Sequence, residues 1–413
     1  MLLYIFFIIS VILLGSVFIG PFSIRVYATV VMMAYLIINY KKSKQKLPNS
    51  FIYFYLAFII LMGIAMGANG EFNEFGYVKT VLSYHLVSIV AYYATGYFNI
   101  TRRQINITIS VLVAIMLATS IVTILQYFNH PVGWGIGSMF GELDISHEER
   151  IENIDDILLG SSLAYGIMQH SFTNAMNISV LGVLSFCNII RSQKIIFRIL
   201  NIAICMTGLA ACFMTQQRSA FYMMLAAYII CMFVCFRKKI VLAVLIIIPI
   251  IYYCVDVNLL FNEDNIGRLA LENSKLDDTR EKLWSDALDF ISENSLWGGP
   301  VAYASLNNGL ASHNFFLNAF IYGGFCGGIV LIILFFKIFA MSIMKLVNMV
   351  QFGNLRQTQF FCLVALIIYL LQGLFHNESL VTGSVVLMLL LALVLVADDT
   401  NCFNKYNINK VQL

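Results

Sequence analysis

Residues 199–236 read ILNIAICMTGLAACFMTQQRSAFYMMLAAYIICMFVCF, an apolar stretch with one charged side chain, Arg218, near its middle. As a single helix it would extend about 57 Å, nearly twice the roughly 30 Å thickness of a hydrocarbon core. An arginine at the bilayer centre would also cost about 2.5–3.5 kcal/mol on insertion scales, and much less at the end of a span. The stretch therefore predicts two short membrane helices, with residues 215–219 at the tip between them.

The composition of the whole chain supports a membrane protein. Hydrophobic residues make up 60% of the 413 residues and charged residues 11%, less than half the share that is typical of a soluble domain. The first residues, MLLYIFFIISVILLG, lack a basic segment and a small-residue cleavage site, so we expect a first span rather than a signal peptide. The nine cysteines lie mostly in apolar runs without a CxxC pair, which favours neither a disulfide framework nor a zinc site.

Apolar runs of about the length needed to cross a bilayer recur along the whole chain. We therefore predict an all-α integral membrane protein with about twelve spans and one polytopic domain, residues 1–413. The expected spans are 2–20, 22–40, 51–68, 80–100, 105–128, 169–190, 199–215, 219–236, 239–256, 313–336, 358–376 and 380–397.

The charges predict the orientation of these spans. Most of the 25 lysines and arginines fall on alternate connections and in the C-terminal tail. The positive-inside rule then places both termini in the cytoplasm. Of the 22 acidic residues, only Asp398 and Asp399 fall on that side. The tip that carries Arg218 then faces outward, as do two large loops at about 129–168 and 257–312. Loops of this length usually carry function.

The second large loop contains a predicted amphipathic helix, residues 277–293. Leu283, Trp284, Ala287, Leu288 and Ile291 form its apolar face, and Asp278 with Glu281 resembles a capping box. Arg280 lies three, four and seven residues before Leu283, Trp284 and Ala287, so it belongs to the same face. It also lies in the expected first turn, where the helix dipole favours an anion. Spacing alone leaves two interpretations open: a snorkelling or surface-paired arginine, and an arginine that binds an anion at the membrane face.

His313 begins the tenth expected span at its outer end. Histidine can act as a general base near neutral pH, although a histidine that only caps the helix is the simpler interpretation. Asn314 and Asn318 share one face, which we expect to point into protein or a wet cavity. Gly323 and Gly327, with Gly324 and Gly328, form overlapping GxxxG pairs that allow close helix packing.

Other polar residues carry weaker signals. His170 and Asn174 could line the same cavity, but structural roles are more common for such residues. Trp134, Trp284 and Trp297 could stack on sugars, although tryptophan is also expected at membrane interfaces. Further candidates for substrate contacts are the loop arginines Arg150 and Arg268. His85 most simply packs inside its span, and Glu71, Glu74 and Glu378 lie on short outer turns without an evident role.

Three segments together resemble the O-antigen ligase and polymerase (Wzy) superfamily of bacterial envelope glycosyltransferases. They are QQRSAFYMM (216–224), TREKLWSDALDFISENSLWGGP (279–300) and SHNFFLNAFIYGGFCGG (312–328), with a looser likeness in GIMQHSFTNAMNIS (166–179). The family often has a proline before the glycines of the middle segment, whereas this chain has Trp297 there. The Arg-x10-Gly spacing of some polymerases is also missing after Arg150 and Arg280.

The resemblance implies a type C glycosyltransferase-like protein of the bacterial inner membrane. Such an enzyme transfers glycan from undecaprenyl pyrophosphate at the periplasmic face, without a metal, a cofactor or a nucleic-acid partner. Arg218 and Arg280 would hold the pyrophosphate and His313 would accept the proton of the attacking sugar hydroxyl, while Asn314, His170, Trp284, Arg268 and Arg150 would contact the substrate. Expected partners are the lipid-linked oligosaccharide, membrane lipid and a chain-length regulator.

The polymerase and ligase reactions share this apparatus. We favour a polymerase of O-antigen repeat units, because the outer loops are idiosyncratic and acidic, as suits a glycan-specific enzyme. The alternative is a ligase that transfers the glycan to lipid A-core. A flippase or other transporter is a third possibility, but its ionisable residues would be expected near the middle of the membrane, and here they gather at the outer interface.

Overall fold

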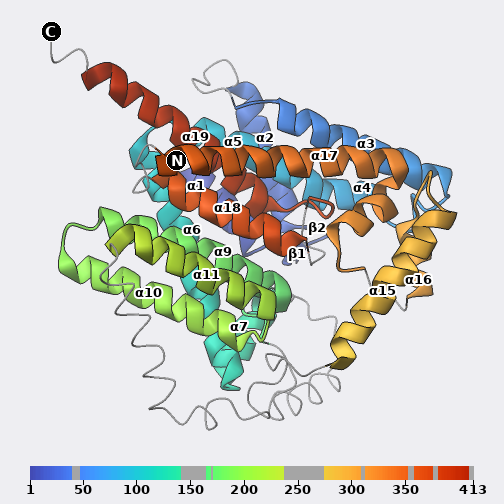
Figure 1. Cartoon of the computed structure of the whole chain (residues 1–413), viewed down its shortest axis with the longest axis horizontal. Coiled ribbons are helices and arrows are strands. Elements are labelled where there is room, and N and C mark those ends of the chain that lie inside the picture. Colours follow the sequence, from blue (N-terminus) through green and yellow to red (C-terminus); the bar gives the residue numbers. More distant parts are fainter. Residues whose placement is uncertain are drawn as a thin grey trace.

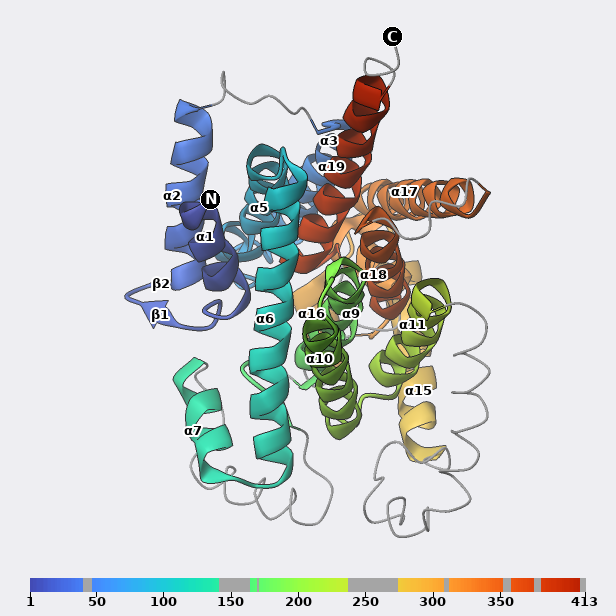
Figure 2. The same ribbon diagram turned by 90° about the vertical axis from the view of Figure 1, so that its left-hand side faces the viewer.

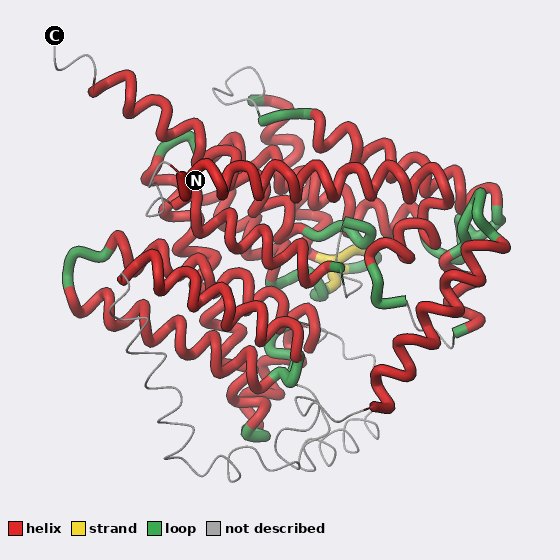
Figure 3. Tube along the Cα trace, viewed as in Figure 1, coloured by secondary structure: helices red, strands yellow, loops and turns green. Residues whose placement is uncertain are grey.

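The structure is a computed structural model of the whole chain, and it describes residues 1–39, 47–140, 164–168, 171–236, 274–307, 312–351, 358–374 and 380–408. These residues are mostly helical (Figure 3). The first helices are α1 (Leu2–Ile12), α2 (Ile24–Ile38), α3 (Ser50–Ala68), α4 (Tyr77–Thr80), the π-helical turn η2 (Val81–His85), α5 (Leu86–Phe98) and α6 (Arg102–Tyr127). The others are α7 (Pro131–Phe140), α9 (Ser171–Arg191), α10 (Ile195–Met214), α11 (Arg218–Phe236), α15 (Ser274–Glu293), α16 (Pro300–Leu306), α17 (Phe315–Gln351), α18 (Thr358–Gly373) and α19 (Val385–Ile408).

These helices form a multi-pass membrane protein. Every expected span contains helix except 239–256, which lies outside the described residues. Five of the described helices are long and apolar enough to cross a membrane, namely α3, α6, α9, α10 and α17, and five further apolar segments are shorter. The first expected span is helical only over Leu2–Ile12, because the chain then forms a short antiparallel hairpin of β1 (Phe18–Ile19) and β2 (Phe22–Ser23) that turns at Gly20. The total number of spans stays a prediction.

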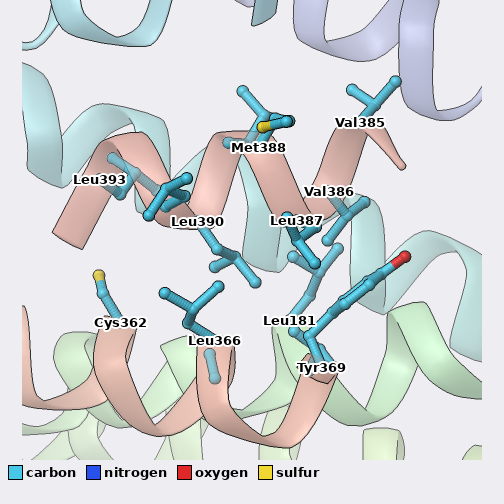
Figure 4. Close-up of a cluster of buried hydrophobic side chains, with 14 of the residues drawn as sticks. Leu181, Cys362, Leu366, Tyr369, Val385, Val386, Leu387, Met388, Leu390 and Leu393 are labelled. Atoms are coloured by element: carbon cyan, nitrogen blue, oxygen red, sulfur yellow. The ribbon is translucent and has the colours of Figure 1, made fainter. Parts of the chain in front are cut away.

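The hydrophobic core extends through the bundle, and one part of it lies where α18 packs between α9 and α19. The first half of α19 is apolar on every side, as is typical of a helix that protein or lipid surrounds. Leu390 and Leu393 of α19, Leu366 of α18 and Leu181 of α9 are almost completely buried against one another (Figure 4). By contrast, α10 exposes apolar side chains such as Ile196 and Leu200 along its outer face, as expected of a helix at the edge of a membrane bundle.

The long helix α17 reverses its direction at Gly324. This residue has φ +60° and ψ −167°, a backbone conformation that only glycine adopts readily. The rings of Phe315 and Phe335 lie 4.8 Å apart and those of Phe316 and Phe336 lie 6.1 Å apart, whereas twenty residues of continuous helix would separate them by about 30 Å. The first arm (residues 315–323) therefore folds back along the second arm (residues 325–351), and the expectation of one continuous span over 313–336 is wrong.

The glycines of this segment have separate tasks. A Cβ atom on Gly323 would lie 3.0 Å from the ring of Phe58, and one on Gly327 would lie 3.5 Å from Leu61, so this GxxxG pair allows close packing against α3. Gly324 forms the reversal, and Gly328 lies against the ring of Phe320 inside the hairpin. Figure 1 shows α3 beside α17, with α15 and α16 at the right-hand end of this pair, and Figure 2 shows α7 beside the lower part of α6.

Candidate active site

The His313 segment enters α17 in a strained backbone conformation. His313 is half-buried and has φ +52°, in the left-handed region that residues other than glycine rarely occupy. Its two neighbours are anchored on either side. Ser312 is fully buried and its hydroxyl donates to Oδ1 of Asn318 at 2.7 Å. Strained residues of this kind cluster at functional sites, so the conformation supports His313 as a candidate.

Asn314 is the N-cap of α17. Its Oδ1 accepts hydrogen bonds from the backbone N–H of Phe316 at 2.9 Å and of Leu317 at 3.3 Å, which otherwise lack acceptors at a helix start. The side chain that caps the helix is thus that of Asn314, and the role of His313 stays a prediction. The shared face of Asn314 and Asn318 points partly into protein, since Asn318 is buried. A contact between Asn314 and substrate stays a prediction.

Helix α15 is attached to the His313 segment through Trp284. The indole Nε1 of Trp284 donates to the carbonyl oxygen of Ser312 at 2.9 Å. Trp284 is therefore used to join two elements, and its role in contacting sugar stays a prediction. Arg280 precedes Trp284 by four residues, so its backbone lies one helical turn away from this contact. The side chain of Arg280 lies outside the described part of the structure.

Two details of the expected helix in the second loop are wrong. The helix begins at Ser274, three residues earlier than expected, so Asp278 lies inside it and cannot form a capping box. Arg280 is consequently its seventh residue, beyond the first turn. The buried face consists of Leu283, Ala287 and Phe290, whereas Leu288 is 58% exposed. Phe290 takes the place expected for Leu288 because α16 and the first arm of α17 cover that side of α15.

The α10–α11 turn confirms that residues 199–236 form two helices. Residues 215–217 join Met214, the end of α10, to Arg218, the first residue of α11. Gln216 has φ +56°, which makes it another strained residue beside a candidate arginine. The side chain of Gln217 donates to Oγ of Ser171 at 3.2 Å and thereby ties the turn to the start of α9. Arg218 is half-buried at a helix N-terminus, where free backbone N–H groups favour an anion.

A buried polar network anchors the end of the first large loop. Oδ1 of Asn174 accepts the hydroxyl of Thr119 at 2.7 Å. Oε1 of Gln126 accepts the backbone N–H of Tyr165 at 3.1 Å and of Gly166 at 2.7 Å, and its Nε2 donates to the carbonyl of Gly166 at 3.0 Å. Asn174 therefore has the structural role that is usual for such residues. Helix α7 of the same loop packs back onto α6.

The structure brings some of the predicted site residues together. Trp284, the His313 segment and the backbone of Arg280 belong to connected elements, while Arg218 starts a helix packed on α9, α10 and α18. In Figure 1 the α9–α10 connection lies at the far left, the α10–α11 turn near the middle and α15 at the right. His170, Arg150 and Arg268 lie outside the described residues.

Glu71, for which the sequence indicates no role, is buried and hydrogen-bonded. Its Oε1 accepts the backbone N–H of Ala302 at 2.9 Å and its Oε2 that of Val301 at 3.2 Å, both in the first turn of α16. The only local signal was a glutamate in a short turn after an apolar run, a pattern shared with Glu74, which is exposed. The partner amides are more than two hundred residues away in the chain, so no spacing argument could find them.

Residues 202–332 match the family model described as O-antigen ligase. No curated protein matches the chain. The matched range contains the α10–α11 turn with Arg218, helices α15 and α16, the His313 segment and the reversal of α17. This match over about a third of the chain supports its resemblance to the superfamily of O-antigen ligases and polymerases.

Proposed function

We propose that this protein is a glycosyltransferase that polymerises the lipid-linked oligosaccharide repeat units of a bacterial surface polysaccharide. It acts at the periplasmic face of the inner membrane and transfers glycan from undecaprenyl pyrophosphate to a sugar hydroxyl of the next unit. The observation that carries the proposal is the position of the His313 segment. It lies within the matched range, has a strained backbone, and is tied by Trp284 to the helix that bears Arg280.

The reaction assigns one task to each of three residues. The hydroxyl of the acceptor sugar attacks the anomeric carbon of the donor, and the imidazole of His313 accepts the hydroxyl proton. The bond from the anomeric carbon to the pyrophosphate oxygen breaks, and its electron pair leaves with the pyrophosphate. Arg218 and Arg280 stabilise the negative charge that develops there, because guanidinium groups bind phosphate oxygens in a bidentate manner. Attack opposite the leaving group inverts the anomeric centre.

Substitutions of His313 and Arg218 test the chemistry directly. His313→Asn is preferred to alanine, because asparagine tolerates the left-handed backbone that His313 adopts. Loss of a general base lowers kcat by about 10²- to 10⁴-fold. Arg218→Lys keeps the charge but loses the bidentate geometry, so we expect activity between that of the wild type and Arg218→Ala. The measurement is glycan transfer in vesicles that contain undecaprenyl-pyrophosphate-linked repeat units, with protein levels checked.

The enzyme proposal fails if alanine at Arg218, Arg280 and His313, each changed alone, leaves the glycan chain lengths of the wild type. Such a result would favour a transporter. The expected result is the loss of long chains in all three variants, at normal protein levels in the membrane.

Ligation of the glycan to lipid A-core is the second candidate, and the description of the matched family as O-antigen ligase favours it. Gel analysis of lipopolysaccharide from a deletion strain separates the two reactions. Loss of a polymerase leaves core that bears a single repeat unit, whereas loss of a ligase leaves bare core. Bare core together with accumulated lipid-linked polymer would exclude the polymerase and establish the ligase.

A further inference from the structure

The turn that follows α3 holds the start of α16 through one buried carboxylate. Each oxygen of Glu71 accepts one backbone N–H group, from Val301 at 3.2 Å and from Ala302 at 2.9 Å. The first N–H groups of a helix have no acceptor inside the helix, and burying them unpaired is costly. Glu71 therefore supplies from a distant part of the chain the acceptors that α16 lacks.

Residues 294–299, the loop before α16, connect the turn after α3 to the reversal of α17. Nδ2 of Asn69 donates to the carbonyl oxygen of Gly298 at 3.0 Å. The next residue, Gly299, donates its N–H to the carbonyl of Ile321 at 2.8 Å, an oxygen that lost its helical partner when α17 turned at Gly324. Gly298 has φ +69°, and a Cβ atom there would collide with that same oxygen. One loop thus joins the turn after α3 to the first arm of α17.

Helix α15 belongs to the same assembly. Ala287 and Phe290 of α15, Tyr303 of α16 and Ile321 of α17 form a small hydrophobic core separate from that of the bundle. The hydroxyl of Tyr303 also donates to the carbonyl of Leu283 at 3.0 Å. We call α15, α16 and residues 312–323 the α15–α17 unit. It contains the backbone of Arg280 and the His313 segment, whereas Arg218 belongs to α11.

We propose that Glu71 is a positioning residue for glycan transfer. By holding the first turn of α16, its carboxylate fixes the α15–α17 unit on α3 and so sets the distance of Arg280 and His313 from Arg218. This inference rests on the proposed function, because it assumes that these three residues act on one substrate. In this proposal Glu71 acts through the backbone of α16, so its substitution lowers the rate of glycan transfer without changing the reaction that is catalysed.

The test compares Glu71→Gln with Glu74→Gln. Glutamine keeps the shape of the side chain, but an NH2 group replaces one of the two acceptor oxygens. This donor then faces a backbone N–H group of α16 that has lost its acceptor. Glu74 lies in the same turn and is exposed, so its substitution controls for the loss of one negative charge. For Glu71→Gln we expect kcat to fall about tenfold or more, because small displacements of catalytic groups have large effects on rate. The KM for the lipid-linked donor should change less than about twofold, and Glu74→Gln should match the wild type.

Amide hydrogen exchange provides a readout that does not depend on activity. In Glu71→Gln, exchange should accelerate in residues 300–306 and in residues 283–291, which share the small core. If Glu71→Gln accumulates poorly, Asn69→Ala can be used instead, because it removes the hydrogen bond from the same turn to Gly298. We expect the same decrease in kcat and the same increase in exchange, at smaller amplitude.

Several outcomes overturn the inference. One is faster exchange in residues 300–306 with an unchanged kcat, since the unit would then be loosened without effect on the reaction. Others are unchanged exchange, a rise in KM at constant kcat, or an equal loss in Glu74→Gln. Failure of the proposed function looks different, because the wild-type protein itself would then transfer no glycan from the lipid-linked donor.

Discussion

The contact between Trp284 and Ser312 can be tested by the substitution Trp284→Phe. Phenylalanine keeps an aromatic ring on α15 but removes the Nε1–H group that donates to the carbonyl of Ser312 at 2.9 Å. Ser312 is fully buried, so its carbonyl would lose this donor in a place that water reaches poorly. Such a loss costs about 1–3 kcal/mol. If this whole free energy is lost from the conformation in which Arg280 and His313 can act on the substrate, kcat decreases by about 5- to 150-fold, at about 1.4 kcal/mol per factor of ten.

The assay is glycan transfer by the purified protein in vesicles, with thermal unfolding measured on the same samples. Trp297→Phe is the matched control. Trp297 is 41% exposed, so replacing its indole by a phenyl ring should change kcat little. We expect a lower kcat for Trp284→Phe, with a melting temperature close to that of the wild type. A wild-type kcat in Trp284→Phe, or an equal loss in Trp297→Phe, would refute the coupling of α15 to His313.

Three further predictions concern the cap, the first large loop and a buried phenol. Asn314→Ala should remove about 1 kcal/mol of helix stability from α17 and lower kcat, while Asn314→Asp should retain the cap; kinetics of both variants check this. Gln126→Leu leaves two backbone N–H groups without their acceptor, at a cost of about 2–6 kcal/mol, and hydrogen exchange in residues 164–168 should accelerate. Burial, and then the nearby Asp286 carboxylate, raise the pKa of Tyr303 to about 12. As the pH rises, the phenol of the unfolded chain, with an ordinary pKa near 10, loses its proton before that of the folded protein. The stability that Tyr303 contributes is therefore complete below about pH 10 and falls toward pH 12. The melting temperatures of the wild type and Tyr303→Phe should converge over this range.

The helices were largely predictable because each depends on a local property of the chain. An apolar run of sufficient length is stable in a bilayer only as a helix, since the backbone must satisfy its own hydrogen bonds there. The same reasoning located the α10–α11 turn around Arg218, because a helix of that length cannot fit within one membrane. The start of α15 was less certain, since helix boundaries depend on tertiary contacts as well as on sequence.

The sequence predicted which residue types form the candidate site, but it predicted only part of how these residues are arranged in space. Arginine and histidine at the ends of apolar runs indicated where charge could meet a phosphate, and the match over residues 202–332 supports the resemblance to the O-antigen ligase family. The cap by Asn314 was not predictable, because histidine and asparagine are adjacent and either could serve the helix start. Leu288 was placed on the buried face by spacing, whereas the packing of α16 selected Phe290 instead.

By itself the sequence determined a multi-pass helical membrane protein, the turn at Arg218 and the resemblance to O-antigen ligases and polymerases, because hydrophobic length and short motifs are local. Only the tertiary structure decided that α17 reverses at Gly324 and that Glu71 holds α16 in place. Both depend on backbone groups at helix ends that must find partners outside their own helix. At the reversal these partners lie in the preceding loop, and for α16 the partner is a glutamate more than two hundred residues away. Nothing in the spacing of residues records that they meet.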